Sequence, residues 1–190
     1  NDMNEPAVME VPNKTFPDDV RHDYDGNPCS HRKAHNIYGM QMAKATYEGL
    51  KKYSYPKRPF VITRSAYSGT QRYTSTWTGD NIATWDHLWI ANIQAQRMSL
   101  SGYSFVGSDI GGFAEQPTGE LYTRWIQLGV FHPFCRAHSS GDHGNQEPWS
   151  FDEDVIDIVR KFIELRYKLL PYIYTAFWRY INEGVPIIKS

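Results

Sequence analysis

Residues 75–85, STWTGDNIATW, contain a predicted strand, one acidic residue and the start of a predicted helix. Small polar residues alternate around Trp77, which favours a strand over residues 75–79. A helical pattern follows over residues 84–100, and Asp80 lies between the two elements. An acid at this place either caps the helix by accepting backbone N–H bonds or lies at the carboxyl end of a buried strand, where active sites form.

The same alternation of strand and helix continues in both directions along the chain. Short apolar runs predict strands, apolar residues spaced three and four apart predict helices, and polar segments with Gly and Pro predict loops. The expected strands are 1–9 (the end of a strand running into a loop), 58–63, 75–79, 102–108 and 132–138; the expected helices are 34–53, 84–100, 118–131 and 152–183; the expected loops are 10–32, 64–74 with one helical turn, and 139–151.

Strands that alternate with helices form a parallel α/β sheet. The segment GSDIGGF lacks the GxGxxG spacing, which disfavours a nucleotide-binding fold. Since five strands do not close an eight-stranded barrel, we expect an incomplete (β/α)8 TIM barrel with about the last five strands and their helices. Residues 1–184 would form this part of the barrel, and residues 185–190 would begin a following β segment. Pro171 predicts a kink or break in the last helix.

The composition is that of a folded protein with no strong charge. Hydrophobic residues make up 41% and charged residues 22% of the 190 residues, and the net charge is −1. We therefore expect neither a nucleic acid nor a membrane as partner. The aromatic content of 15% suits sugar rings, which stack on flat faces. Two cysteines make no disulfide framework, and because the chain opens on NDMNEP without an initiating methionine, we expect it to be part of a longer chain.

Charged and polar side chains gather at the predicted strand ends. Two of them, Asp2 and Asp80, are the minimum needed to split a glycosidic bond, one as nucleophile or base and the other as acid. Either acid alone has a simpler interpretation, which is a loop ion pair for Asp2 and a helix cap for Asp80. Charged groups are costly to bury unpaired, so the whole set favours a polar ligand. The other members of the set are Asp109, Arg64, Arg136, His35, His138, Trp77 and Phe113.

Six segments resemble a known family. NDMNEP, HNIYG, PFVITRSAYSGTQRY, WTGDN, GSDIGGF and HPFCRAH occur in the order found in glycoside hydrolase family 31, whose members include retaining α-glucosidases. The loop CRAHSSGDHGNQEPW and the short gap between the two acids most resemble the glucosidase II branch. The resemblance covers the second half of the family's barrel. It implies that the front half of the barrel and further β-domains of the same polypeptide are the partners of this chain.

The resemblance also implies roles for residues at matching positions. Asp2, in DMNEP, matches the catalytic nucleophile, and Asp80, in WTGDN, matches the general acid/base. Other matches line the subsite for the non-reducing sugar, or hold the acids in place without touching the sugar. The first group comprises Met3, Arg64, Trp77, Asp109, Phe113 and His138, and the second comprises Glu5, His35 and Arg136.

These roles imply a retaining, exo-acting α-glycosidase that works by double displacement. The expected kind is an α-glucosidase that releases glucose from the non-reducing ends of α-glucosides or α-glucans. An α-xylosidase, α-galactosidase, α-transglucosylase or α-glucan lyase shares the machinery, and a non-catalytic sugar-binding homologue is the alternative from another class. The presence of both aspartates argues against that homologue. The resemblance implies no cofactor and no metal, and it leaves secreted, periplasmic and lumenal compartments open.

Some remaining features have simple interpretations. His31 and His35 have the spacing of zinc ligands on a helix, but the glutamate of HExxH is missing, which favours a surface or supporting role. The loop with Asp142, His143 and Glu147 favours a buttress of the pocket over a metal site. Tryptophans at helical spacing are expected in the core, and these are Trp85, Trp89 and Trp125.

Overall fold

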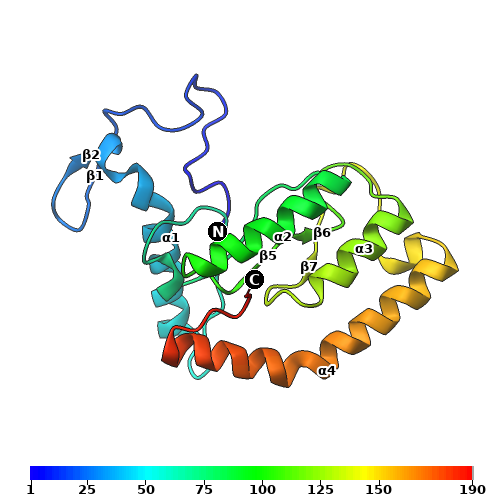
Figure 1. Ribbon diagram of the computed structural model, residues 1–190. Helices are drawn as coiled ribbons and strands as arrows, with labels where there is room; N and C mark the ends of the chain where they lie inside the picture. Colours follow the sequence, from blue (N-terminus) through cyan, green and yellow to red (C-terminus); the bar gives the residue numbers. More distant parts are fainter. Residues whose placement is uncertain (190) are drawn as a thin grey trace. The chain divides into compact units, whose positions relative to one another are not determined.

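The structure is a computed structural model that describes residues 1–189. The chain divides into two compact units, Asn1–Thr76 and Trp77–Ser190. Figure 1 labels the hairpin and α1 of the first unit, and α2 to α4 with β5 to β7 of the second. None of the helices within the described residues is both long and apolar enough to cross a bilayer.

The first unit consists of a small hairpin, one long helix and a parallel strand pair. The start of the chain lies alongside β3, because Asn1 N donates to Ile62 O at 2.6 Å and Arg64 N donates to Asn1 O at 3.1 Å. Residues 1–9 contain no assigned strand, so the expected strand end is reduced to these two backbone bonds, and residues 4–6 form a turn. The elements are β1 (Arg21–His22), antiparallel to β2 (Cys29–Ser30); α1 (His31–Tyr53); β3 (Ile62–Thr63), parallel to β4 (Ser75–Trp77); and the 3-10 turn η1 (Thr70–Arg72).

Three details of this unit bear on the sequence predictions. The single helical turn expected in residues 64–74 is confirmed as η1. The loop expected over residues 10–32 is partly wrong, because β1 and β2 pair within it. The helix expected from residue 34 begins at His31, since β2 leads directly into α1.

The second unit alternates strands and helices. Strands β6 and β7 pair in parallel, and backbone bonds run from Thr78 N to Gly107 O and from Phe134 N to Val106 O. The alternating parallel α/β order is therefore confirmed, with strands shorter than expected. The elements are α2 (Trp85–Leu100), β5 (Val106–Gly107), β6 (Asp109–Ile110), α3 (Gly119–Gly129), β7 (Arg136–Ala137), the 3-10 turn η2 (Pro148–Ser150) and α4 (Glu153–Glu183). Strands β6 and β7 are parallel, and the pairings among residues 1–189 do not close a ring.

Helix α4 runs through Pro171 without interruption, so the expected break is wrong. Proline removes one N–H donor and crowds the preceding turn, which bends a helix that is otherwise well packed, and Figure 1 shows α4 bending along its length. Asp152 caps its start by accepting from Val155 N, and Gly184, at φ 71°, ends it. Residues 185–189 do not form the expected strand; Ile187 N donates instead to Ser104 Oγ. Residue 190 lies outside the described residues.

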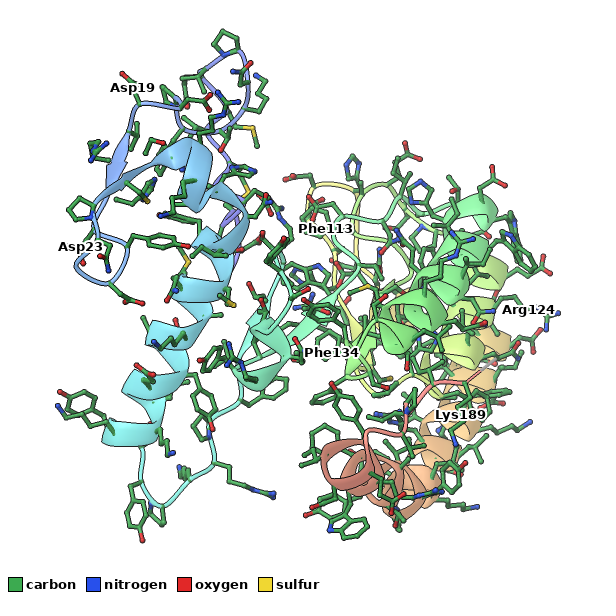
Figure 2. All side chains as sticks on the ribbon, turned by 60° about the vertical axis from the view of Figure 1, so that its left-hand side comes forward. Asp19, Asp23, Phe113, Arg124, Phe134 and Lys189 are labelled. Atoms are coloured by element: carbon green, nitrogen blue, oxygen red, sulfur yellow. The ribbon has the colours of Figure 1, made fainter. Side chains whose placement is uncertain are left out.

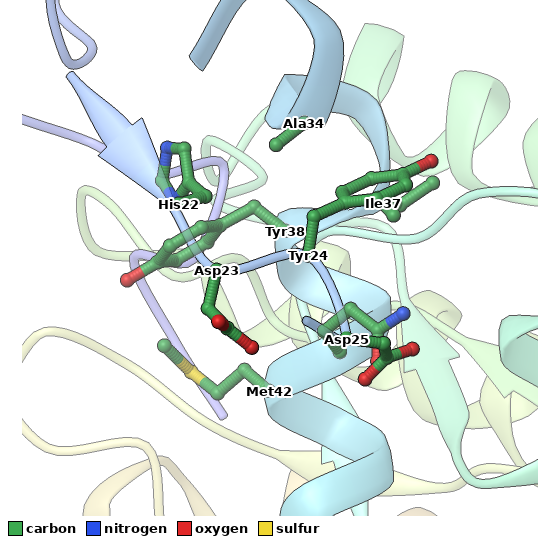
Figure 3. Close-up of a pocket in the computed structure, with 9 residues that line it drawn as sticks. His22, Asp23, Tyr24, Asp25, Ala34, Ile37, Tyr38 and Met42 are labelled. Carbon is green, nitrogen blue, oxygen red and sulfur yellow. The ribbon is translucent and has the colours of Figure 1, made fainter. Parts of the chain in front are cut away.

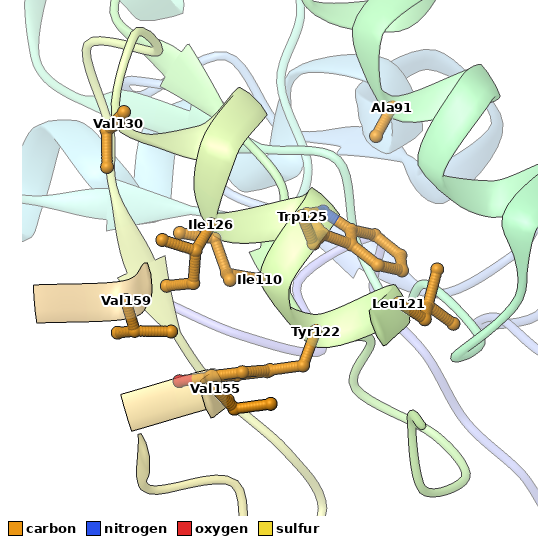
Figure 4. Close-up of a cluster of buried hydrophobic side chains, with 9 residues drawn as sticks. All are labelled: Ala91, Ile110, Leu121, Tyr122, Trp125, Ile126, Val130, Val155 and Val159. Atoms are coloured by element: carbon orange, nitrogen blue, oxygen red, sulfur yellow. The ribbon is translucent and has the colours of Figure 1, made fainter. Parts of the chain in front are cut away.

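The apolar core of the second unit lies between its helices and β6 (Figure 4). Trp125 is fully buried, as expected, and its Nε1 donates to Ser108 Oγ at 2.9 Å. The core predictions for Trp85 and Trp89 are wrong, because these side chains are 51% and 66% exposed. The buried stripe of α2 consists instead of the small residues Ala91, Ala95 and Ser99. The core cluster comprises Ala91, Ile110, Leu121, Tyr122, Trp125, Ile126, Val130, Val155 and Val159.

One arginine holds the chain between α3 and β7. Arg166, on α4, donates to the carbonyl oxygens of Val130, His132 and Pro133 at 2.8, 2.5 and 2.8 Å. His132 is buried beside it, and burial together with the positive charge of Arg166 lowers the pKa of His132 from 6.5 to about 4. The imidazole is therefore held neutral in the folded protein at pH 7.

We predict that stability falls in acid because of His132. A histidine whose folded pKa is depressed contributes stability that is present above its unfolded pKa and lost as pH falls toward the folded pKa. The window runs from 6.5 down to about 4, and the loss amounts to about 3 kcal/mol at most. Urea unfolding of the complete polypeptide measures it: wild type should lose stability more steeply than His132→Gln across this window. Equal slopes for the two proteins would contradict the assignment.

Candidate active site

Asp2 lies directly after the residue that pairs with β3. Its Oδ1 accepts a hydrogen bond from Met3 N at 2.8 Å and lies 3.3 Å from Arg64 Nε. The Asp2 side chain is 61% exposed, whereas that of Arg64 is only 17% exposed. Met3 has a φ of 55°, a conformation that is uncommon outside glycine. The arrangement presents an open carboxylate whose charge faces a fixed guanidinium.

Arg64 also binds Glu5 through two hydrogen bonds. Its Nε donates to Oε1 at 2.8 Å and its Nη2 donates to Oε2 at 2.9 Å, and Nη2 lies 2.8 Å from the Met3 sulfur. The Arg64 hydrogen bonds lower the pKa of Glu5 despite its partial burial. The paired fork geometry fixes the guanidinium plane, and with it the distance from Arg64 to Asp2. Asp2, Met3, Glu5 and Arg64, four of the predicted site residues, are therefore in contact.

Asn4 is a residue that sequence reasoning missed. It is completely buried, and its Nδ2 donates to Thr63 Oγ1 at 2.8 Å and to Gly39 O at 3.4 Å, while its Oδ1 accepts from Ser65 N at 3.2 Å. A Cβ at Gly39 would lie 2.9 Å from Asn4 O, so only glycine lets α1 approach this closely. Asn4 thus ties Asp2's segment to α1 and to the end of β3. Its position inside DMNEP, two residues after Asp2, is the sequence signal that could have identified it.

His35 lies in a histidine cluster beside the hairpin. His31 Nε2 is 3.0 Å from His35 Nδ1, and His31 Nδ1 is 2.8 Å from His22 Nε2. His35 hydrogen-bonds in addition to Thr15, at 3.5 Å, and the structure does not bring it to Asp2 by a hydrogen bond. Burial lowers the pKa of His31, and the neighbouring histidines add to this effect. No group of three or more metal-binding side chains within residues 1–189 has the geometry of a metal site.

A pocket of about 440 Å³ opens between the hairpin and α1 (Figure 3). None of the predicted sugar-binding or catalytic residues lines it. It is lined by His22, Asp23, Tyr24, Asp25, Ala34, Ile37, Tyr38, Gln41 and Met42.

In the second unit an ion pair with a buried carboxylate joins the first residues of two strands. Asp109 on β6 and Arg136 on β7 are register partners, and Arg136 Nη2 donates to Asp109 Oδ1 at 2.6 Å. The Arg136 guanidinium carbon lies 5.4 Å from the Trp77 ring centre and 5.1 Å from that of Phe134. Three predicted site residues, Trp77, Asp109 and Arg136, are therefore in contact around one cation.

The hydrogen-bonding capacity of this group is only partly used. Asp109 is fully buried, and its Oδ2, Arg136 Nε and Trp77 Nε1 have no hydrogen-bond partner among residues 1–189. Burial raises the pKa of Asp109, the Arg136 hydrogen bond opposes that rise, and the negative charge of Asp80 adds to it. Buried polar groups are normally paired, so a cluster of unpaired donors and acceptors fits a hydroxyl-rich ligand.

Asp80 is exposed and follows β4. The helix-cap interpretation is wrong for Asp80, because Thr84 caps α2 by accepting from His87 N. The next residue, Asn81, accepts from Phe113 N at 2.7 Å through its carbonyl oxygen. The acid is thus anchored through its neighbour to the loop after β6.

Phe113 and His138 form an aromatic pair at the same edge. Phe113 lies in the loop that follows β6 (Figure 2), and its ring centre is 5.3 Å from that of His138 at an angle of 36°. Ser140 N donates to Phe113 O at 2.9 Å, which joins the loops after β6 and β7. The second unit therefore brings together the remaining predicted sugar-binding residues.

Comparisons with known proteins agree with this geometry. Residues 1–176 match the glycosyl hydrolases family 31 TIM-barrel domain. The chain belongs to glycosyl hydrolase family 31. It is 47% identical over 189 residues to an alpha-glucosidase 2 of Bacillus thermoamyloliquefaciens, and the match covers all of this chain and 24% of that one. It is 46% identical over 191 residues to the glucosidase 2 subunit alpha of Saccharomyces cerevisiae, and the match covers all of this chain and 20% of that one.

The fold comparison gives the same family. The structure superposes on a crystal structure of a glucosidase II alpha subunit bound to Glc1Man2 with a TM-score of 0.94 at 42% identity, covering all of this chain and 20% of that one. The fold is accordingly that of a family 31 TIM-barrel domain. The chain spans about a fifth to a quarter of the length of the relatives that it matches.

We predict that Asn4→Ala destabilises the protein by about 1–3 kcal/mol, because the fully buried Thr63 hydroxyl would lose the hydrogen bond from Asn4 Nδ2. The matched control is Asn36→Ala, an exposed asparagine on α1, whose effect should stay within about 0.5 kcal/mol. Urea unfolding compares the two variants, and equal effects would contradict a locking role for Asn4.

We also predict an acid-dependent loss of stability from Glu5. Because its folded pKa lies below the ordinary 4.5, its ion pair contributes above the unfolded pKa and is lost as pH falls through the folded pKa. Glu5→Gln should flatten the fall of the urea midpoint as the pH drops below the unfolded pKa of 4.5. A variant as pH-sensitive as wild type would show that Arg64 does not stabilise the ionised Glu5.

Proposed function

We propose that this chain forms the second half of the catalytic barrel of a retaining α-glucosidase. The substrate would be an α-glucoside or α-glucan from which glucose is released at the non-reducing end. Membership of family 31 and the high identity to proteins named alpha-glucosidase 2 and glucosidase 2 support this proposal. It needs no cofactor and no metal.

The observation that carries the proposal is the environment of Asp2. A nucleophilic carboxylate must be ionised and open to substrate, and Asp2 is 61% exposed while its Oδ1 lies 3.3 Å from the Arg64 guanidinium. Arg64 is in turn fixed by its two hydrogen bonds to Glu5. A loop ion pair without further function would not require a positive φ at Met3 or a fully buried Asn4 behind it.

The chemistry would be a double displacement. In the first step an oxygen of Asp2 bonds to the anomeric carbon, the bond to the leaving oxygen breaks, and Asp80 donates its proton to that oxygen. In the second step Asp80 takes a proton from water, the water oxygen bonds to the anomeric carbon, and the Asp2 ester bond breaks. The stereochemistry is retained, which requires the two carboxyl groups to lie about 5–5.5 Å apart.

The other site residues would bind or position the sugar. The unpaired oxygen of Asp109 and the indole N–H of Trp77 are suited to ring hydroxyls, and Phe113 with His138 offers an aromatic wall. Met3 and Arg64 would border the sugar beside the nucleophile. Glu5 would hold Arg64, Arg136 would hold Asp109, and His35 would act through the histidine cluster.

The finer architecture belongs to the same proposal. Residues 1–184 would supply about the last five strands of the barrel and their helices, and residues 185–190 would lead into a following β segment. The front half of the barrel and β-domains of the same polypeptide would complete the site. The shortness of this chain relative to its relatives supports this proposal.

We predict that the complete polypeptide hydrolyses an aryl α-glucoside and that Asp2→Ala abolishes the activity, because no covalent intermediate can form. Asp80→Ala should lose activity toward substrates with poor leaving groups by about 10²–10⁴-fold, since the leaving oxygen is no longer protonated. Aryl α-xyloside, α-galactoside and β-glucoside are tested in parallel.

The outcomes separate the candidate functions. Release from another α-sugar alone would keep the mechanism and replace the substrate with xylose or galactose. Transfer of glucose to a second sugar in place of water would indicate a transglucosylase. Sugar binding by a folded protein without any release would favour the non-catalytic homologue and contradict the proposal.

A further inference from the structure

The loop before η2 contains a buried side chain that the proposed mechanism does not use. Gln146 is 7% exposed, and its Nε2 donates to Gly112 O at 2.9 Å. Its Oε1 is buried and has no hydrogen-bond partner among residues 1–189. An unpaired buried acceptor lowers stability, so stability alone does not account for a glutamine at this place.

Gln146 faces a turn that only glycine can form. Gly111 and Gly112 have φ values of 88° and 92°. A Cβ at Gly111 would lie 2.5 Å from Gln146 Oε1, and a Cβ at Gly112 would lie 2.6 Å from Ala83 N. The turn is therefore closed in by Gln146 on one side and by the start of the α2 segment on the other.

This turn connects the groups proposed to bind the sugar. Gly112 N donates to Asp109 O at 3.1 Å, and the next residue, Phe113, donates its N–H to Asn81 O at 2.7 Å. Asn81 directly follows Asp80, the proposed acid. A displacement of the Gly112 peptide would therefore move Phe113 and disturb Asp109 and the Asp80 segment together.

We propose that Gln146 is a positioning residue, which fixes the Gly111–Gly112 turn through the Gly112 carbonyl and so sets Asp109 and Phe113 against the sugar. This inference rests on the proposed function. Gln146 acts through the turn and not by touching the substrate.

The test is Gln146→Met in the complete polypeptide, assayed with an aryl α-glucoside. Methionine keeps the volume and removes both the donor and the unpaired acceptor. We expect kcat to fall by about 10–100-fold with little change in KM, since a misplaced group chiefly harms the transition state. The urea midpoint should stay close to that of wild type, because removal of the unpaired Oε1 offsets the loss of the donor to the Gly112 carbonyl.

Gln116→Met is the matched control. Gln116 is exposed, and its Nε2 donates at 2.8 Å to Asn145 O, one residue before Gln146. It anchors the same loop without reaching the glycine turn, so its replacement should leave kcat unchanged. Equal losses of kcat in both variants, or a loss in Gln146→Met that matches a loss of stability, would overturn the proposal.

Gln146→Glu tests whether lowering the pH restores the hydrogen bond to Gly112 O and with it kcat. A protonated Glu side chain can donate to Gly112 O as Gln146 does, whereas an ionised one repels it. The ratio of variant to wild-type kcat should therefore rise as pH falls. A ratio independent of pH would contradict a role for the Gly112 hydrogen bond.

Hydrogen exchange separates this inference from the proposed function. If wild type hydrolyses no α-glycoside, the proposed function fails, and exchange at the Gly112 and Phe113 amides still tests the positioning. These amides should exchange faster in Gln146→Met than in Gln116→Met. Equal exchange would overturn the proposal.

Discussion

The hydrogen-bonded ion pair between Asp109 and Arg136 is the constraint on which the second unit depends. A fully buried carboxylate is tolerated only where a cation and hydrogen bonds compensate its desolvation. Because Asp109 and Arg136 are register partners, their pairing fixes how β6 lies against β7. The same register sets Gly107 against Phe134, where a Cβ would lie 1.9 Å from the carbonyl oxygen. The register of the strands is therefore fixed by these contacts although each strand is only two residues long.

The first unit applies the same principle with an exposed acid. Arg64 is fixed by Glu5 and faces Asp2, while Asn4 locks the segment from beneath. In both units one guanidinium pairs with a carboxylate beside a parallel strand, and in the second unit some of the buried polar atoms are unpaired. The second of these sites retains unused hydrogen-bonding capacity that a ligand could satisfy.

The order of elements could be predicted from the sequence, because apolar runs and the polar residues after them are local signals, whereas the roles of the site residues came from the resemblance to family 31 and stay predictions. The exposure of Trp85 and Trp89 could not be predicted, because helical spacing shows that residues share a face of the helix but not whether that face is buried. The buried face of α2 carries small residues such as Ala91, which allow close packing. The hairpin at residues 21–30 consists of two-residue strands, too short to show a period. Asn4 and Gln146 were missed because their importance comes from contacts with residues distant in sequence.

The central claim is that Asp2 attacks the sugar. The most direct measurement is to incubate the complete polypeptide with a fluorinated α-glucosyl substrate whose glycosyl–enzyme intermediate hydrolyses slowly, and to locate the added mass by peptide mapping. The account predicts one glucosyl ester on the peptide that contains NDMNEP, at Asp2, and none in Asp2→Ala. A label on another carboxylate, or steady turnover with no label, would contradict it.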